Sequence, residues 1–306
     1  MTTRVVAIYG PTASGKSAAA IALAHLIGGE VVSADSMQIY RGLERITNQP
    51  TATEQQGVPH HLLGHVDPHE PYDVVQYATD AHAAIDEILA RDATPIVAGG
   101  SGLYLRAALA ELAFPPQAAQ AARKRIRVQV QDLGPDRAHA HLTAIDPVAA
   151  ARIAPADTRR IVRALELAEL GESLAPETDD ALWTDSVRHP TRLFGLHIDR
   201  ALVHARIDAR TPHLLEGGGI DEINALLSDP RPLSHTAARA HGLDDVRALR
   251  EGSIDRAECE RRLSTRTRQY AKRQDTWLRR LRSAEPIDAN RDPERIAAEI
   301  AERLQA

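Results

Sequence analysis

Cysteine is almost absent from this chain, and long apolar runs are absent altogether. Only Cys259 occurs in 306 residues, which excludes an internal disulfide and any zinc site built from several cysteines. No apolar run approaches the roughly 20 residues that a helix needs to cross a bilayer. The first ten residues have the pattern of a strand and lack the apolar core and cleavage site of a secretory signal. We therefore expect a cytoplasmic protein with no membrane partner.

Positive charge is scarce over the whole chain but concentrated near its end. The net charge is −5, which by itself argues against a polyanionic partner. Between Arg261 and Arg282, however, nine residues are basic and only Asp275 is acidic. Because phosphate binding depends on a local cationic surface, the overall acidity is compatible with a face that binds nucleic acid.

The hydrophobic pattern predicts an α/β fold with an interruption. Three short apolar runs in the first hundred residues alternate with two segments of helical spacing, which is typical of a parallel sheet flanked by helices. Residues 117–170 are rich in Ala and Arg and lack a strand pattern, whereas 191–198 resume it. We predict a core made of residues 1–113 and 185–306, and an all-helical insertion domain of residues 114–184.

The sharpest motif is GPTASGKS, which follows the first predicted strand and opens a helix. It consists of Gly10, Pro11, Thr12, Ala13, Ser14, Gly15, Lys16 and Ser17. This is the P-loop pattern, in which backbone N–H groups and a helix N-terminus surround a phosphate. Lys16 adds a positive charge, and the hydroxyl of Ser17 is a suitable ligand for Mg²⁺. The motif does not distinguish ATP, another nucleotide or a diphosphate ester.

Polar residues also follow the second and third predicted strands. Asp35 ends the second strand, and open α/β sheets bind ligands at the carboxyl ends of their strands. It is a candidate for binding substrate, assisting magnesium or acting as a general base, with a helix N-cap as the structural alternative. Gly99, Gly100 and Ser101 follow the third strand. There the glycines permit close backbone approach, and the Ser101 hydroxyl is either a phosphate ligand or part of a tight turn.

The basic segment has helical periodicity with two distinct faces. One face is expected to pack on the core and contains Leu263, Thr267, Tyr270, Gln274, Trp277 and Leu281. The second is a basic stripe of Arg262, Arg266, Arg273 and Arg280. Such a stripe suits backbone phosphates, and a solvated charged face is the alternative. Arg206 and Arg210 lie one helical turn apart elsewhere, as expected either for a diphosphate clamp or for surface ion pairs.

Seven segments resemble the tRNA dimethylallyltransferase (tRNA isopentenyltransferase) family, in the family's order and over essentially the whole chain. They are GPTASGKS, SADSMQIY, VPHHLL, AGGSGLYLRA, DPVAAARIAPADTRRIVRALE, LVHARIDAR and YAKRQDTWLR. The combination is far more specific than the P-loop alone. Two positions depart from the family pattern: Leu243 stands where an aromatic residue is usual, and Gln49 where a lysine is usual.

The resemblance implies a P-loop NTPase-like fold whose loop holds dimethylallyl diphosphate instead of ATP, with Arg210 as a further diphosphate ligand. It implies transfer of the dimethylallyl group to the exocyclic amine of the adenosine 3′-adjacent to the anticodon, with release of diphosphate. Asp35, Lys16 and Ser101 would be the catalytic residues, with Asp35 as the base. Ser17 would hold Mg²⁺, the implied cofactor.

The resemblance also implies three groups of tRNA contacts. Those near the reacting centre are Asp35, Ser36, Met37, Gln38 and Ser101. Those in the insertion are Arg123, Arg159, Arg160, Ile161, Val162 and Arg163. Those in the basic helix are Lys272, Arg273, Gln274 and Arg279. The expected partners of a monomeric enzyme are therefore the tRNA anticodon stem-loop and dimethylallyl diphosphate.

Three other interpretations of the residues stay open. They are a small-molecule P-loop kinase, an enzyme that prenylates free adenine nucleotides, and a non-enzymatic RNA-binding module with a nucleotide switch. The basic helix and the helical insertion favour tRNA over free nucleotides, and Asp35 has no role in a simple binding module.

Overall fold

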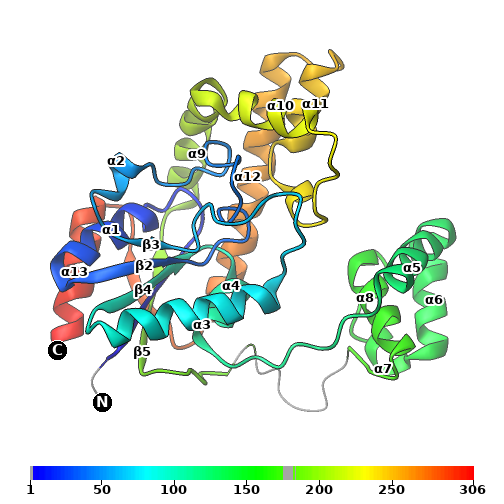
Figure 1. Ribbon diagram of the computed structural model, residues 1–306, viewed down its shortest axis with the longest axis horizontal. Coiled ribbons are helices and arrows are strands. Elements are labelled where there is room, and N and C mark those ends of the chain that lie inside the picture. Colours follow the sequence, from blue (N-terminus) through cyan, green and yellow to red (C-terminus); the bar gives the residue numbers. More distant parts are fainter. Residues whose placement is uncertain (1–2, 175–181, 183) are drawn as a thin grey trace. The chain divides into compact units, whose positions relative to one another are not determined.

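A six-stranded parallel sheet forms the centre of the molecule. The computed structural model describes residues 3–174, 182 and 184–306. The strands are β1 (Val5–Tyr9), β2 (Gly29–Ser33), β3 (His60–His61), β4 (Thr94–Gly99), β5 (Thr191–His197) and β6 (Glu285–Asp288). Their order across the sheet is β3-β2-β4-β1-β5-β6 (Figure 1). The predicted parallel α/β fold is confirmed.

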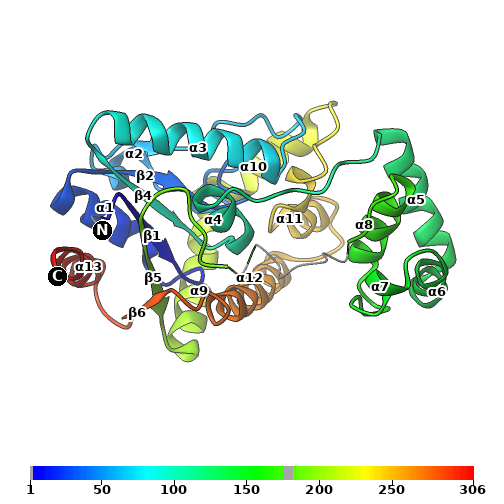
Figure 2. The same cartoon turned by 90° about the horizontal axis from the view of Figure 1, so that it is seen from below.

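Helices cover both faces of this sheet. On one face lie α1 (Lys16–Ile27) and α13 (Pro293–Gln305), and on the other lie α3 (Val74–Ala90) and α4 (Gly102–Leu109) (Figures 1 and 2). The core under α1 and α13 takes alternate side chains of the strands, because successive strand residues point to opposite faces. Its buried strand residues are Val6, Ile8, Val31, Ile96, Ala98, Phe194, Leu196 and Ile287.

The strand register brings three loops to one edge of the sheet. Tyr9, the last residue of β1, pairs with Gly99, the last residue of β4, and Ser33 at the end of β2 pairs with Ala98. The loops that follow β1, β2 and β4 therefore begin side by side. This is the carboxyl edge at which parallel sheets bind ligands.

The chain divides into two compact units: Met1–Glu111 with Asp185–Ala306, and Leu112–Thr184. The second unit contains α5 (Gln120–Leu133), α6 (Pro135–Ile145), α7 (Pro147–Ala150) and α8 (Thr158–Glu169), and its described residues form no strand. Its own core includes Ile126, Val130, Leu142, Ile161 and Leu165. Residues 175–181 and 183 of the predicted insertion lie outside the described part of the chain.

The remaining regular elements of the first unit are helices. They are α2 (Ala52–Gln55), α9 (Arg200–Leu214), a π-helical turn (Leu215–Gly219), α10 (Ile220–Ser228), a short 3₁₀ turn (Ala237–Arg239), α11 (Leu243–Arg250) and α12 (Arg256–Leu278). The long α12, which carries the basic segment, packs against α9, α11 and α4. No helix in the described ranges is both long and apolar enough to cross a bilayer.

Candidate functional site

The loop between β1 and α1 has the backbone of an anion cradle. Ala13 and Gly15 adopt left-handed φ angles of 64° and 85°, so the chain curls tightly before α1 begins. At Gly10 a Cβ atom would stand 2.9 Å from Cβ of Leu196, so only glycine fits there. The Lys16 ammonium donates a hydrogen bond to the carbonyl of Pro11 at 3.1 Å. Lys16 thereby folds back over the loop that a phosphate would enter.

Several polar atoms around this loop lack partners within the described chain. The hydroxyl of Ser14 and Nε of Arg210 are buried without any hydrogen bond. Buried polar atoms are normally paired, so these two are unsatisfied donors in and beside the loop. Burial lowers the pKa of Lys16 to about 8, while Asp35 raises it and Arg210 lowers it further. An incoming anion would relieve this cost of holding two cations close together.

Two arginines of α9 reach the P-loop. Arg210 donates to the Thr12 hydroxyl at 2.9 Å, and Arg206 donates to the carbonyl of Ala13 at 3.2 Å. Neither guanidinium forms an ion pair with a carboxylate among the described residues. The surface ion pairs considered from the sequence are therefore not formed. The arrangement favours a clamp on a phosphate-bearing ligand.

Asp35 stands at the end of β2, on the same edge of the sheet. One oxygen, Oδ1, accepts the N–H of Met37 at 2.9 Å, which caps a turn instead of a helix. No hydrogen bond within the described chain engages the other oxygen. The charge of Asp35 acts on Lys16, as described above, and it also opposes the lowering of the His241 pKa that burial causes. Asp35 is thus close to the P-loop and partly available to a ligand.

Ser101 connects the β2 loop to α12. Its hydroxyl accepts the N–H of Ser36 at 3.2 Å and lies 3.1 Å from the hydroxyl of Tyr270. Burial, followed by the charge of Asp35, raises the pKa of Tyr270, so this phenol stays protonated. The ring of His241 meets Tyr270 edge-on, with centroids 4.9 Å apart. The structure therefore brings Asp35, Ser101 and Tyr270 close together beside the P-loop.

Steric contacts explain why glycine occupies three positions at and just after the end of β4. A Cβ at Gly99 would come within 2.1 Å of the Ala34 carbonyl oxygen, and one at Gly102 within 2.1 Å of the Trp277 ring. A Cβ at Gly100 would lie 2.0 Å from Nε2 of Gln274. The loop is glycine-rich because the end of β2 and α12 press against it.

The packed face of α12 forms as predicted, but its basic stripe is partly neutralised. Arg262 pairs with Glu258 at 2.6 Å, Arg266 with Asp245 at 3.1 Å, Arg268 with Asp208 at 2.5 Å and Arg279 with Asp275 at 2.5 Å. Two of these carboxylates come from other helices. Lys272 is exposed without a carboxylate partner in the described chain, and Arg273 lies over the Tyr270 ring at 5.6 Å.

Two residues expected to contact RNA are buried in this structure. Gln274 is 2% exposed, and both ends of its amide are bonded within the chain. Ile161 is fully buried in the core of the helical unit. Neither side chain can meet RNA in this conformation, and both contribute to internal packing instead. The helical periodicity already places Gln274 on the packed face of its helix, whereas the contact with RNA comes only from the family resemblance.

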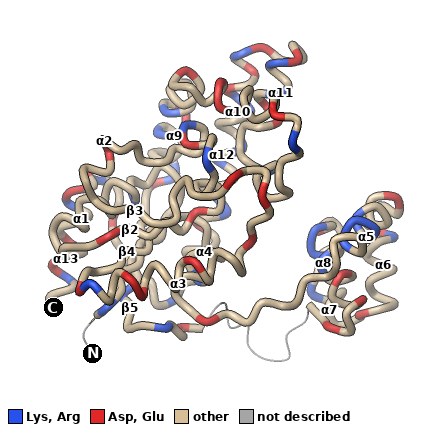
Figure 3. Tube along the Cα trace, viewed as in Figure 1, with Lys and Arg blue, Asp and Glu red and all other residues tan. Residues whose placement is uncertain are grey.

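The four arginines of the helical unit that are expected to contact RNA fall into two groups. Arg159 and Arg160 are exposed at the start of α8, whereas Arg123 and Arg163 flank the buried carboxylate of Glu166 at 3.7 and 3.5 Å. Arg163 also donates to the carbonyls of Pro115 and Pro116, at the entry to the unit. Basic positions gather along α5 and α8 (Figure 3). Several of these basic side chains pair with carboxylates, so only some of the positive charge is left unneutralised within the described residues.

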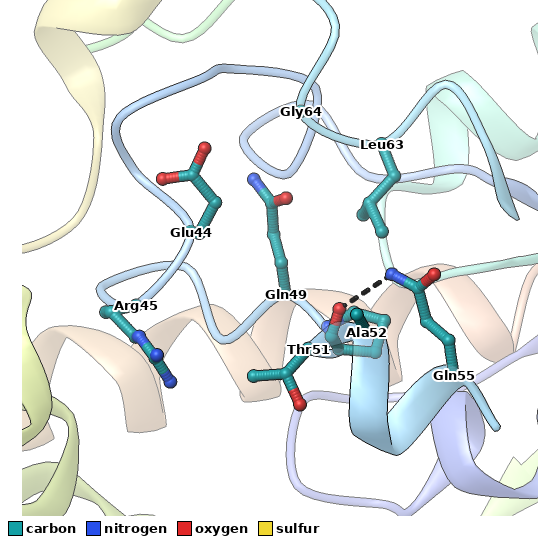
Figure 4. A pocket seen from close by; sticks show the side chains of 9 residues that line it. Glu44, Arg45, Gln49, Thr51, Ala52, Gln55, Leu63 and Gly64 are labelled. Atoms are coloured by element: carbon teal, nitrogen blue, oxygen red, sulfur yellow. Dashed lines mark hydrogen bonds between the residues drawn. The ribbon is translucent and has the colours of Figure 1, made fainter.

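A cavity of about 420 Å³ lies between the segment that precedes β3 and the loop that follows it. Its lining residues are Glu44, Arg45, Gln49, Pro50, Thr51, Ala52, Gln55, Leu63 and Gly64 (Figure 4). The amide of Gln49 donates to the carbonyl of Tyr40 at 3.0 Å. Gln38, three residues after Asp35, donates to the carbonyls of Thr47 and Asn48. The position where Gln49 departs from the family pattern therefore borders a polar cavity tied to the Asp35 loop.

Residues that sequence reasoning misses complete the site. The sequence places Tyr9 only in a strand, yet its hydroxyl donates to the carbonyls of Gly100 and Gln274, each at 3.2 Å. The sequence places Tyr270 on the packed face of its helix, without a role toward Ser101. The only sequence signal for either is a hydroxyl-bearing ring in an otherwise apolar pattern.

Together these features define a P-loop α/β protein with a cluster of cationic side chains, Lys16, Arg206 and Arg210, at the carboxyl edge of its sheet. Residues 38–281 match the family model described as IPP transferase. The chain belongs to this family, and its curated relatives are named tRNA dimethylallyltransferase. One from Anaeromyxobacter sp. (strain Fw109-5) is 44% identical over 94% of this chain and 96% of its own. Another, from Corynebacterium glutamicum, is 39% identical over 96% and 97%.

Solved structures agree with this assignment. A full-length tRNA isopentenylpyrophosphate transferase from Bacillus halodurans superposes with a TM-score of 0.71 and is 33% identical over 99% of this chain and 97% of its own. A eukaryotic dimethylallyltransferase acting on tRNA gives a TM-score of 0.73 and 27% identity over 94% of this chain and 74% of its own. The P-loop NTPase-like fold predicted from the sequence is confirmed.

Proposed function

We propose that this protein transfers the dimethylallyl group of dimethylallyl diphosphate to the exocyclic amine of the adenosine 3′-adjacent to the anticodon in tRNA. The observation that carries the proposal is the meeting of a P-loop, the Arg210 clamp and the half-engaged carboxylate of Asp35 at one sheet edge, in a chain of this family. A kinase would need the same P-loop. A kinase activity would not, however, explain the helical unit of this chain or the tRNA dimethylallyltransferase activity for which its relatives are named.

The two substrates and these residues account for every bond and proton in the proposed reaction. The adenine amine nitrogen attacks the allylic carbon, the carbon–oxygen bond breaks, and diphosphate leaves with the electron pair. Lys16, the loop N–H groups and Arg210 stabilise the charge that develops on the leaving group, and such preorganised electrostatics is commonly the largest catalytic contribution. Asp35 accepts the amine proton, a form of assistance typically worth about 10²–10⁴-fold.

Mg²⁺ fits the residues at the start of α1 only together with the diphosphate. No group of three or more His, Cys, Asp or Glu that could hold a metal ion occurs in the described ranges. Mg²⁺ is usually bound through few protein groups plus phosphate oxygens and waters. We propose that the Ser17 hydroxyl is its protein ligand. The ion would supply further neutralisation of the departing diphosphate.

The tRNA is proposed to bind through exposed cations of both units. An adenosine in an anticodon loop must leave its stack to reach a pocket beside Asp35, so the base is expected to flip. The exposed residues Lys272 and Arg273 on α12 and Arg159 on α8 suit its phosphates, whereas Arg160 lies 3.7 Å from the carboxylate of Asp157. We also propose that the enzyme is a monomer and acts in the cytoplasm.

The decisive test is incubation with bulk tRNA and labelled dimethylallyl diphosphate, followed by identification of the nucleosides by mass. Dimethylallyladenosine in digested tRNA is the expected product. Label on free AMP or adenosine instead of tRNA would favour the free-nucleotide alternative. Consumption of ATP with a small-molecule acceptor would favour the kinase.

The ion pairs of α12 predict unequal contributions to RNA binding. Replacing Lys272 and Arg273 together by Gln should weaken tRNA binding and lower its salt dependence, by ~0.7–0.9 log units for each phosphate that is no longer neutralised. The matched control is Arg262→Gln, because Arg262 is already neutralised by Glu258. Titrations of tRNA at several salt concentrations measure the slopes. Equal slopes in the parent and the double variant would place the tRNA elsewhere.

The lowered pKa of Lys16 predicts a pH dependence of ligand binding. Lys16 is protonated below its pKa of about 8 and loses its charge as the pH rises through that value. The affinity for inorganic diphosphate should therefore fall above pH 8, and bound diphosphate should shift the step upward by linkage. Calorimetric titrations on both sides of this pH measure the change. Lys16→Gln should bind weakly without the step, and a step that persists in this variant would assign it to another group.

A further inference from the structure

Gln274 closes a ring of hydrogen bonds at the P-loop. Its Oε1 accepts the N–H of Thr12 at 2.7 Å, and its Nε2 donates to the carbonyl of Gly100 at 2.9 Å. Its own backbone carbonyl accepts the hydroxyl of Tyr9 at 3.2 Å, and that hydroxyl also reaches Gly100. One buried residue of α12 thus joins the P-loop and the loop after β4 through its side chain, and the end of β1 through its backbone carbonyl.

The ring determines the shape of the loop at Thr12. The Thr12 N–H is directed to Gln274, while the Thr12 hydroxyl accepts from Arg210 at 2.9 Å. Thr12 is therefore held from α12 on its backbone side and from α9 on its side-chain side. Glycine at position 100 leaves space for this amide, because a Cβ atom there would lie 2.0 Å from Nε2 of Gln274. A side chain that merely filled space would not require both directional bonds.

We propose that Gln274 is a positioning residue for the diphosphate site. It fixes the backbone of the P-loop at Thr12 and, through the Thr12 hydroxyl, the guanidinium of Arg210. Two residues before it, Lys272 faces solvent on the same helix. The helix proposed to meet tRNA is thereby bonded directly to the loop proposed to hold the leaving group. This inference rests on the proposed function only for the identity of the diphosphate ester.

The test compares two Gln274 variants with an exposed glutamine of the same helix. Gln274→Met keeps the length of the side chain and removes both hydrogen bonds, whereas Gln269→Met changes an exposed position. We expect Gln274→Met to weaken binding of inorganic diphosphate and of dimethylallyl diphosphate about tenfold or more, because the N–H of Thr12 and the carbonyl of Gly100 lose their partner. The tRNA affinity should stay close to that of the parent, and Gln269→Met should match the parent in every measurement.

Gln274→Glu supplies a readout that a packing role would not give. Its carboxylate can still accept from Thr12 but cannot donate to Gly100, so diphosphate binding should also weaken. Protonation restores a donor. The ratio of variant to parent affinity, measured at each pH, should therefore recover as the pH falls toward the range in which glutamate titrates. A ratio that does not change with pH would contradict the proposal.

Two results with Gln274→Met would also overturn the inference. One is a folded Gln274→Met variant that binds inorganic diphosphate as the parent does. The other is a loss of diphosphate and tRNA affinity in equal proportion, with lowered thermal stability, because that pattern means general destabilisation. Inorganic diphosphate keeps this test separate from the proposed function. If the parent forms no prenylated nucleoside, the function fails, while binding of diphosphate still decides the role of Gln274.

Discussion

Replacing Asp35 with asparagine is expected to lower the single-turnover rate of prenyl transfer by roughly 10²-fold or more. Asparagine keeps an oxygen that accepts the Met37 N–H, so the turn after β2 should persist. It removes the negative charge and the ability to take the amine proton. Rapid-quench assays with saturating tRNA and dimethylallyl diphosphate measure this rate directly.

The control for Asp35→Asn is the affinity for inorganic diphosphate. Asp35 raises the pKa of Lys16, so the comparison belongs well below pH 8, where Lys16 stays charged; there, loss of the negative charge should leave that affinity unchanged or slightly tighter. Asp35→Ala, which also removes the acceptor for Met37, distinguishes damage to the turn from loss of the base. A single-turnover rate in Asp35→Asn close to that of the parent would remove the catalytic assignment.

Lys16→Gln is expected to lower the same rate by about 10²–10³-fold, the cost typical of removing one donor that stabilises developing charge. Within the described residues the Lys16 ammonium bonds only the carbonyl of Pro11, so its removal should leave the fold intact. Affinity for inorganic diphosphate should fall as well, whereas tRNA should bind as it does to the parent. Single-turnover assays and tRNA titrations on the same preparation separate the two effects.

The double variant of Lys272 and Arg273 gives the complementary pattern. It should lose tRNA affinity but keep the rate at saturating tRNA, because neither residue touches the P-loop in the structure. If Lys16→Gln weakened tRNA binding as strongly as the double variant, the diphosphate and RNA sites could not be as separate as proposed.

Local sequence predicts the fold and the P-loop because their determinants are local. The alternation of apolar strands and helices requires only near neighbours, and GPTASGKS contains its own turn and helix start. The same holds for the face of α12 that packs on the core, since its period is read within one helix. The strands β3 and β6 are different. They contain two and four residues, and pairing with distant strands, not their own pattern, makes them strands.

The parts of the site that escape prediction depend on pairings between distant residues. The bond between Gln274 and Thr12 spans 262 positions, and nothing near either residue announces it. The sequence overestimates the free charge of α12 for the same reason: the acids Asp208 and Asp245 that neutralise Arg268 and Arg266 belong to other helices. A charge count along one segment cannot include partners that only folding brings near.

The closure of the P-loop by α12 has a consequence for biosynthesis. The ribosome makes residues 10–17 almost first, but the side chains that hold Thr12 come from Arg210 and Gln274. The central strand β1 also pairs with β5, which follows the helical unit in the sequence. A nascent chain that has emerged only as far as the helical unit therefore carries a complete phosphate-binding sequence without a formed phosphate site. Because folding proceeds from the N-terminus during synthesis, the enzyme would acquire its ligand only when translation is nearly complete.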